Sequence, residues 1–273
     1  MSAITGTASF KIWLVLPGAQ ALDVSKCKTL RRLRQSNDIE QELIEIQTEE
    51  NTQSTKNLNL IELLRHSRFK WPIITSLVLN AIQQLSGINA VFFYSGDMFS
   101  AAGLKEEKIF YGILATGVIN LLATLLSLRL IELLGRRPLI IWPMTLIVLL
   151  MVVLCVLVEV NRRKSQEGIA IGALILILIF IILFAIGLGP IPTVYSNEVF
   201  AIEAKSAGLS SAMFINWFCN FLVALLFLPL QMIMNGYVFL LFFACVAAAF
   251  GLLFFKMPET KNKKLLEIES FWK

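Results

Sequence analysis

Six amide side chains lie inside long apolar stretches of the sequence, and they are the residues best suited to bind a solute. They are Gln83, Gln84, Asn89, Asn120, Asn216 and Asn220. An unsatisfied polar group in hydrocarbon costs several kcal/mol, so each amide needs a hydrogen-bond partner. Because Gln and Asn both donate and accept, they suit the wall of a site for a neutral polyol. The flat apolar faces that such a solute also needs are available from Trp217, Phe92, Phe93 and Phe184.

For any single amide, the alternative is an ordinary hydrogen bond between two membrane helices. The cluster of Gln83, Gln84 and Asn89 favours a shared site, because residues at these spacings lie on one helix face or on adjacent turns.

Charged residues gather in the connections between the apolar stretches. No carboxylate or histidine lies deep in a stretch, as a proton relay usually requires, and the single histidine, His66, lies in a charged segment. Three connections contribute the group Glu132, Arg136, Arg137, Glu198, Lys205 and Glu259. We predict that this group forms a cytoplasmic charge network that holds helix ends together in one conformation. The alternative is solvated loop charges, whose pairs are worth about 0 to 1 kcal/mol each.

The composition is that of a membrane protein, with 57% hydrophobic and 16% charged residues. A spanning helix needs roughly 20 apolar residues. Six stretches meet this length, and they are approximately Trp71 to Met98, Phe110 to Leu130, Leu139 to Val158, Ile169 to Tyr195, Ala207 to Leu230 and Tyr237 to Phe255. The net charge of +5 comes from short basic clusters between the stretches, which does not favour nucleic-acid binding. The spacing of the four cysteines indicates no metal site, and we expect no cofactor.

Two of the six stretches are interrupted by polar residues, glycine or proline, and both end in a similar signature. Tyr94-Ser95-Gly96-Asp97-Met98-Phe99 closes the first stretch, and Tyr195-Ser196-Asn197-Glu198-Val199-Phe200 closes the fourth. Interrupted spans at corresponding positions of two repeats are typical of transporter binding sites.

Lysine and arginine in the short connections predict the orientation, because cytoplasmic loops carry the excess of these residues. The richer side includes both termini, so we expect both to be cytoplasmic. Before the first span, Lys26 to Glu50 and Asn57 to Arg65 have patterns typical of helices outside the bilayer. We therefore expect an N-terminal segment with linker helices at 1–70, a six-helix bundle at 71–256 and a cytoplasmic tail at 257–273.

Five motifs together resemble the sugar porter branch of the major facilitator superfamily, and most closely the animal facilitative glucose transporters. The resemblance runs from about Lys26 to the C-terminus. The motifs are Gln83 to Tyr94, Gly135-Arg136-Arg137, Gly189-Pro190-Ile191-Pro192, Asn216-Trp217 and Pro258-Glu259-Thr260-Lys261.

The resemblance implies an all-α membrane fold of twelve helices in two bundles. This chain would supply the second bundle, helices seven to twelve, as two inverted three-helix repeats, and would need an N-terminal six-helix bundle as partner. The residues that the resemblance places at the substrate are Gln83, Gln84, Asn89, Asn120, Asn220 and, packed beside it, Trp217. Phe93 and Tyr94 match a gating lid, and the charged group described above matches the family's cytoplasmic network.

The family pattern is broken at Thr193, which replaces a tryptophan of glucose-selective members, and at Ala185, which replaces a glutamate. A small residue at the first position is a feature of fructose-handling relatives, whereas Asn216 follows the glucose-type pattern.

The resulting hypothesis is facilitative transport of a glucose-like hexose by alternating access in the plasma membrane, with the sugar and the lipid bilayer as partners. The alternatives are a truncated membrane protein that does not transport, and a carrier of fructose or another sugar. A membrane enzyme is disfavoured, because paired intramembrane aspartates, a His-Glu-x-x-His motif and a serine with a histidine at depth are all missing from the sequence.

Overall fold

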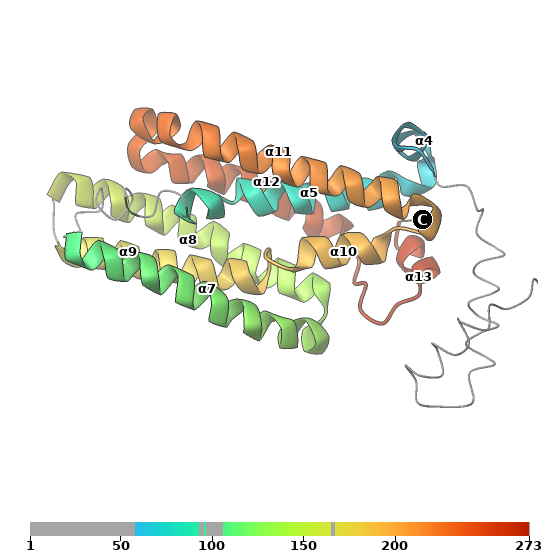
Figure 1. Ribbon diagram of the computed structural model, residues 1–273, viewed down its shortest axis with the longest axis horizontal. Helices are drawn as coiled ribbons and strands as arrows, with labels where there is room; N and C mark the ends of the chain where they lie inside the picture. The colour runs from blue at the N-terminus through green and yellow to red at the C-terminus, as the bar shows by residue number, and fades with distance from the viewer. Residues whose placement is uncertain (1–57, 93–95, 97–105, 165–166, 273) are drawn as a thin grey trace, which may run out of the picture. The chain divides into compact units, whose positions relative to one another are not determined.

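The computed structural model describes residues 58–92, 96, 106–164 and 167–272, all of which belong to the unit Lys56–Lys273. The linker expected at Lys26 to Glu50 and the gating pair Phe93 and Tyr94 lie outside the described residues. Every regular element in the described part is a helix (Figure 1). The elements are α4 (Leu60–Arg65), η1 (Ser67–Phe69), α5 (Lys70–Leu85), α7 (Glu106–Leu134), α8 (Arg136–Lys164), α9 (Glu167–Ile186), α10 (Ile191–Val199), α11 (Ile202–Met234), η2 (Asn235–Tyr237), α12 (Val238–Lys256) and α13 (Leu265–Ser270).

Four stretches of the described residues are long and apolar enough to cross a membrane. They are Glu106–Leu134, Arg136–Asn161, Ile171–Val199 and Ile202–Lys256. The third contains most of α9 and all of α10, and the fourth contains both α11 and α12. Five of the six expected spans therefore lie in these stretches. The remaining one begins with α5, which has only 16 residues because the expected interruption ends it.

The first interruption lies at Ser86 and Gly87, after which residues 88–92 are helical again. Gly87 has φ +85°, a left-handed conformation that residues with a Cβ adopt at a cost. A Cβ there would also lie 2.8 Å from the Phe242 ring of α12, so both the backbone and the packing require glycine. The second interruption separates α9 from α10, where Pro190 and Pro192 have no N–H for a continuous helix.

The two interrupted helices lie against each other. The short α10 packs on α5, while α5 also packs on α11 and α12, and α8 packs on α9 and α12 (Figure 1). Hydrogen bonds join the α5–α10 contact, with 2.9 Å between Thr75 Oγ1 and Tyr195 OH and 2.6 Å between Ser76 Oγ and Ser196 Oγ. All four side chains are buried, so this pairing satisfies groups that would otherwise be costly.

The C-terminal helix α13 is attached to the start of the bundle. Arg68, which precedes α5, forms an ion pair with Glu269 at 2.7 Å and a longer one with Glu203 at 3.3 Å. The hydrogen bond to Glu269 raises the pKa of the Arg68 guanidinium. Trp272 Nε1 donates to the carbonyl oxygen of Lys256 at 2.8 Å, which fixes the residues after α13 to the end of α12.

Candidate functional site

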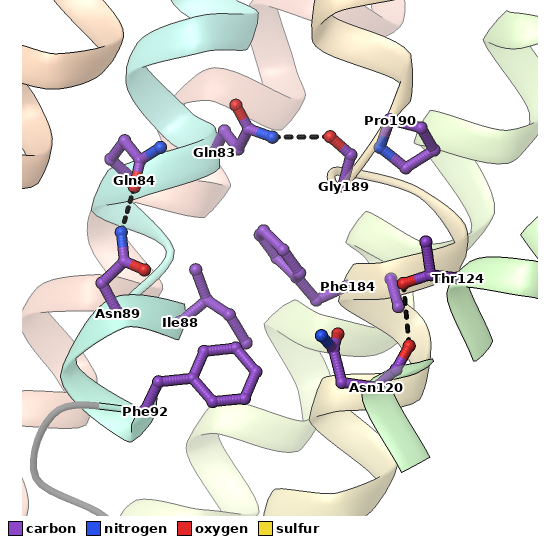
Figure 2. A pocket seen from close by; sticks show the side chains of 11 residues that line it. Gln83, Gln84, Ile88, Asn89, Phe92, Asn120, Thr124, Phe184, Gly189 and Pro190 are labelled. Carbon is purple, nitrogen blue, oxygen red and sulfur yellow. Dashed lines mark hydrogen bonds between the residues drawn. The ribbon is translucent and has the colours of Figure 1, made fainter. Parts of the chain in front are cut away.

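A cavity of about 390 Å³ lies between the interrupted helices and α7. Its lining comes from α5 and the residues after it, from α7, from the end of α9 and from the break before α10 (Figure 2). The lining residues are Gln83, Gln84, Ile88, Asn89, Phe92, Asn120, Thr124, Phe184, Ala185, Gly189 and Pro190. None of these side chains is ionisable, so the cavity has the chemistry for an uncharged polar solute.

Two consecutive glutamines of α5 form one side of the cavity. Gln83 Nε2 donates to the carbonyl oxygen of Gly189 at 2.6 Å, which is available because Gly189 lies in the break before α10. Gln84 Nε2 donates to Asn216 Oδ1 at 2.8 Å, and Asn216 Nδ2 donates to Gln83 Oε1 at 2.6 Å. Asn216 of α11, which does not line the cavity, therefore bridges the two glutamines.

The network of amides continues past the break in the first helix. Asn89 Nδ2 donates to Gln84 Oε1, and Asn220 Nδ2 of α11 donates to the same oxygen at 3.3 Å. Asn120 reaches the cavity from α7 on the opposite side (Figure 2). The structure thus brings four of the predicted substrate residues to one cavity and places Asn220 in contact with one of them.

Apolar surfaces complete the lining. Phe184 of α9, Phe92 and Ile88 stand between the amides of Gln84 and Asn89 and that of Asn120, and Pro190 lies beside Gly189 (Figure 2). Rings at this position offer flat faces to the C–H side of a polyol, while the amides face its hydroxyls.

The remaining predicted substrate residues do not line this cavity. Trp217 of α11 is 64% exposed, and Thr193 of α10 is also exposed. The sequence prediction missed Thr124, whose side chain lines the cavity one turn after Asn120. The spacing of four residues on one helix was the signal that could have found it.

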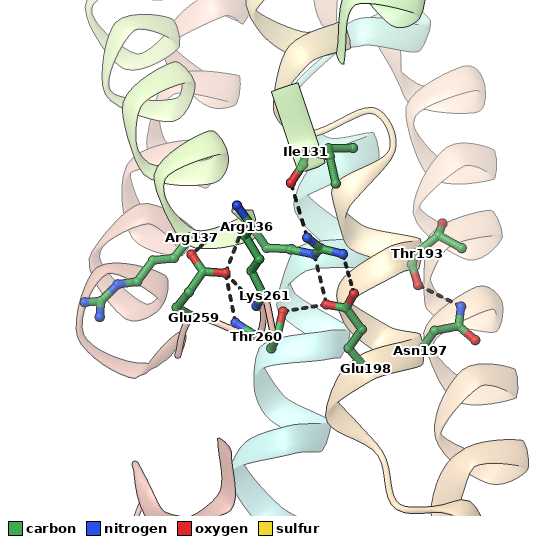
Figure 3. A network of polar contacts seen from close by, with 9 residues as sticks. All are labelled: Ile131, Arg136, Arg137, Thr193, Asn197, Glu198, Glu259, Thr260 and Lys261. Atoms are coloured by element: carbon green, nitrogen blue, oxygen red, sulfur yellow. Dashed lines mark hydrogen bonds and ion pairs between the residues drawn. The ribbon is translucent and has the colours of Figure 1, made fainter. Parts of the chain in front are cut away.

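The predicted charge network is partly assembled at the ends of α8 and α10. Arg136 forms a bidentate pair with Glu198, with Nη2 at 2.6 Å from Oε1 and Nε at 3.1 Å from Oε2 (Figure 3). Thr260 Oγ1 donates to Glu198 Oε2 at 2.6 Å, so the segment after α12 joins the same carboxylate. Bidentate arginine–carboxylate pairs add geometric specificity to the attraction.

Glu259 accepts four backbone N–H groups. Its Oε1 accepts from Arg136 at 2.9 Å, from Thr260 at 2.9 Å and from Lys261 at 2.9 Å, and its Oε2 accepts from Arg137 at 3.1 Å (Figure 3). Because α8 begins at Arg136, the carboxylate also lies at the positive end of a helix dipole. The Pro-Glu-Thr-Lys motif therefore caps α8.

Gly135 makes this cap possible. It has φ +93°, and a Cβ there would lie 2.7 Å from Glu259 Oε2. Arg137 extends away from the cap and donates to the Phe254 carbonyl oxygen at 2.9 Å. Within the described residues, Glu132 and Lys205 contribute no ion pair to this group, and Glu132 is exposed.

Comparison with known proteins places the chain among sugar transporters. A family model described as "Sugar (and other) transporter" matches residues 11–272. Facilitated glucose transporter member 2 of Sus scrofa is 36% identical over 88% of this chain and 45% of its own length, and human member 14 is 38% identical over 88% and 46%.

Solved structures show the same fold. A double-tryptophan mutant of XylE is 24% identical, with a TM-score of 0.75 over 93% of this chain and 53% of that one. The inward-open xylose transporter XylE from E. coli is 26% identical, with a TM-score of 0.60 over 89% and 48%.

The expected major facilitator fold is thereby confirmed, and the relatives are transporters by name, not enzymes. The chain spans about half the length of the curated relatives that it matches. With a family model covering nearly all of its residues, the chain belongs to the sugar (and other) transporter family, whose members are multi-pass membrane proteins.

Proposed function

We propose that this chain is the C-terminal half of a facilitative hexose transporter, which binds a glucose-like sugar in the amide-lined cavity and moves it by alternating access. One observation carries the proposal: four amide side chains from α5, the residues after it and α7 meet at one cavity, and none of the described residues that line it is ionisable. Members of the same family that are more than a third identical are named as glucose transporters, which supports a hexose as the solute.

The hydrogen bonds within the cavity suit weak, reversible binding. A neutral hydrogen bond contributes about 1 kcal/mol net, because it replaces another one. A sugar hydroxyl that bonds to one of these amides gives up a bond to water, while the bonds that order Gln83, Gln84 and Asn89 are kept, so the gain for each contact is small. Several such contacts give a total near the 4 kcal/mol of millimolar affinity, which allows release on the other side.

The partner that we propose is an N-terminal six-helix bundle. Phe214, Trp217 and Phe221 of α11 are 70%, 64% and 58% exposed, and their spacing places them on one helix face. Asn220 follows Trp217 by three residues and contacts Gln84, so the face adjoins the amides. A second bundle that covers this face would bring Trp217 beside the sugar, as the resemblance implies.

We also propose that the protein resides in the plasma membrane with both termini in the cytoplasm. The pair between Arg136 and Glu198 and the cap by Glu259 would then lie on the cytoplasmic side. In that position they would hold α8, α10 and the tail together in one state of the transport cycle and release them in the other.

One observation favours a second candidate, a membrane protein that binds a partner bundle but does not transport. The glutamines bond to neighbouring protein groups, as amides do in a purely structural contact between helices.

Uptake into proteoliposomes separates the two candidates. The chain is reconstituted alone and together with the N-terminal half of the human relative named above, and uptake of D-glucose and D-fructose is compared with that of L-glucose. Saturable, stereoselective uptake in either preparation supports transport, and competition between glucose and fructose identifies the preferred sugar. Co-purification of the two halves without stereoselective uptake of either sugar would refute transport and favour the second candidate.

A further inference from the structure

Two backbone carbonyls determine which way the side-chain amides of Gln83 and Asn216 are turned. Gly189 O receives a hydrogen bond from the Gln83 side chain at 2.6 Å, and Asn80 O receives one from the Asn216 side chain at 3.2 Å. A backbone carbonyl can only accept, so each amide must turn its NH₂ group toward it. Hydrogen-bonding chemistry alone therefore sets the orientation of both amides.

The orientation of Asn216 then fixes the orientation of Gln84. With its NH₂ group between Asn80 O and Gln83 Oε1, Asn216 has only its oxygen left for Gln84. Gln84 must therefore donate to it, as the 2.8 Å bond from Nε2 to Oδ1 shows. Asn216 is 7% exposed and does not line the cavity, so it acts on the site only through the two glutamines.

The same alternation of hydrogen-bond donors and acceptors continues into the cavity. Since Gln84 donates on one side, its oxygen faces Asn89 and Asn220, which both donate to it. Asn89 must therefore turn its own oxygen away from Gln84, and Figure 2 shows that oxygen on the side of the other lining residues. Among the residues that the structure describes, Asn89 Oδ1 has no hydrogen-bond partner.

We infer that Asn216 is a positioning residue that sets the donor and acceptor order of these amides, so that the cavity offers the Asn89 oxygen to a hydroxyl that donates. The inference rests on the proposed function and adds a rule of selectivity to it. At the position that faces Asn89, the sugar must carry a hydrogen-bond donor. An acceptor there meets another acceptor.

Pairs of sugar analogues test this rule. At each hydroxyl, a deoxy analogue can neither donate nor accept, while a fluoro analogue can accept weakly but cannot donate. Their inhibition constants are measured against hexose uptake in whichever of the two proteoliposome preparations described above takes up hexose. For the unmodified chain, at least one hydroxyl should show a shared loss of affinity, meaning that its deoxy and fluoro analogues both bind about five- to tenfold more weakly than the parent sugar.

Two variants at position 216 should then behave differently. Asn216→Leu removes the acceptor for Gln84, which frees the amides of Gln84 and Asn89 to turn over, and the shared loss should shrink to less than about twofold. Asn216→Asp, with its carboxyl protonated, keeps an acceptor for Gln84 and an O–H donor for Gln83 Oε1, and it should retain the shared loss. The control is Asn197→Leu, the same change at an exposed amide of α10 that donates to the Thr193 carbonyl oxygen, and it should match the unmodified chain.

The possible failures are distinct. If the unmodified chain takes up no hexose in either preparation, the proposed function fails. If it takes up hexose but Asn216→Leu keeps the full shared loss, the positioning role is wrong while the proposed function stands. If every hydroxyl tolerates fluorine better than its removal, the cavity donates at those positions and the inferred order is reversed. A variant that does not fold is recognised by size-exclusion chromatography, and the other variant at the same position then decides the outcome.

Discussion

Replacing Glu259 by glutamine should destabilise the bundle through the loss of the cap on α8. The carboxylate accepts four backbone N–H groups, three at Oε1 and one at Oε2, at 2.9 to 3.1 Å. Glutamine has one oxygen, so its NH₂ group must face at least one of these donors. The change leaves the side-chain volume almost unaltered, so the effect isolates the hydrogen bonds and the charge.

The magnitude can be worked out from these contacts. One hydrogen bond to a charged group is lost, worth about 1.5 to 3 kcal/mol, and the others become neutral bonds of about half the strength. The interaction with the α8 dipole adds about 0.3 to 1 kcal/mol. These contributions total at least about 4 kcal/mol. Because Glu259 is only partly buried, water recovers at least half of the loss, and we expect a net decrease of about 2 to 3 kcal/mol in the free energy of unfolding.

Thermal unfolding in detergent checks this expectation. For a chain of this size, a change of 1 kcal/mol lowers the melting temperature by about 2 to 4 °C, so Glu259→Gln should lower it by roughly 5 to 10 °C. Glu267→Gln is the matched control, because Glu267 is an exposed side chain of α13. Equal shifts for the two variants would show that the cap contributes nothing and would refute the reasoning.

Two further substitutions test the interrupted helices. Gly87→Ala should cost at least about 2 kcal/mol in thermal unfolding, because φ is +85° and the new Cβ would lie 2.8 Å from an aromatic ring of α12. The control Gly117→Ala, whose Cβ would have nothing within 4 Å, should cost nothing. Equal melting temperatures for the two variants would contradict this reasoning. Ser196→Ala should lower stability by about 1 to 3 kcal/mol because it leaves Ser76 without its buried partner on α10, and an unchanged melting temperature would mean that this contact contributes nothing.

Much of the fold could be predicted from the sequence because its signals are local. Apolar length predicts the spans, and glycine and proline predict the two interruptions, since both residues act on their own stretch of backbone. The grouping of Gln83, Gln84 and Asn89 at one cavity is also a consequence of helix spacing.

The pairing of the amides could not be predicted in this way. Asn216 lies outside the local cluster of Gln83, Gln84 and Asn89. Its bridging position depends on how α11 packs against α5, more than a hundred residues away in the chain. The exposure of Trp217 has the same origin, because only the packing decides which face of α11 remains uncovered. For the charge network, local sequence could not show that Glu259 would bind backbone groups of α8 while Arg136 pairs with Glu198.

The most direct test of the amide-lined cavity is the concentration dependence of hexose uptake by Gln83→Ala in the preparation that transports. Loss of the Gln83 amide removes its bond to Gly189 and its contact with the sugar, so we expect the half-saturation concentration to rise at least about tenfold, with normal membrane insertion. Asn197→Ala, at an exposed amide outside the cavity, should transport normally. Unchanged uptake kinetics in Gln83→Ala would contradict the assignment of this cavity as the sugar site.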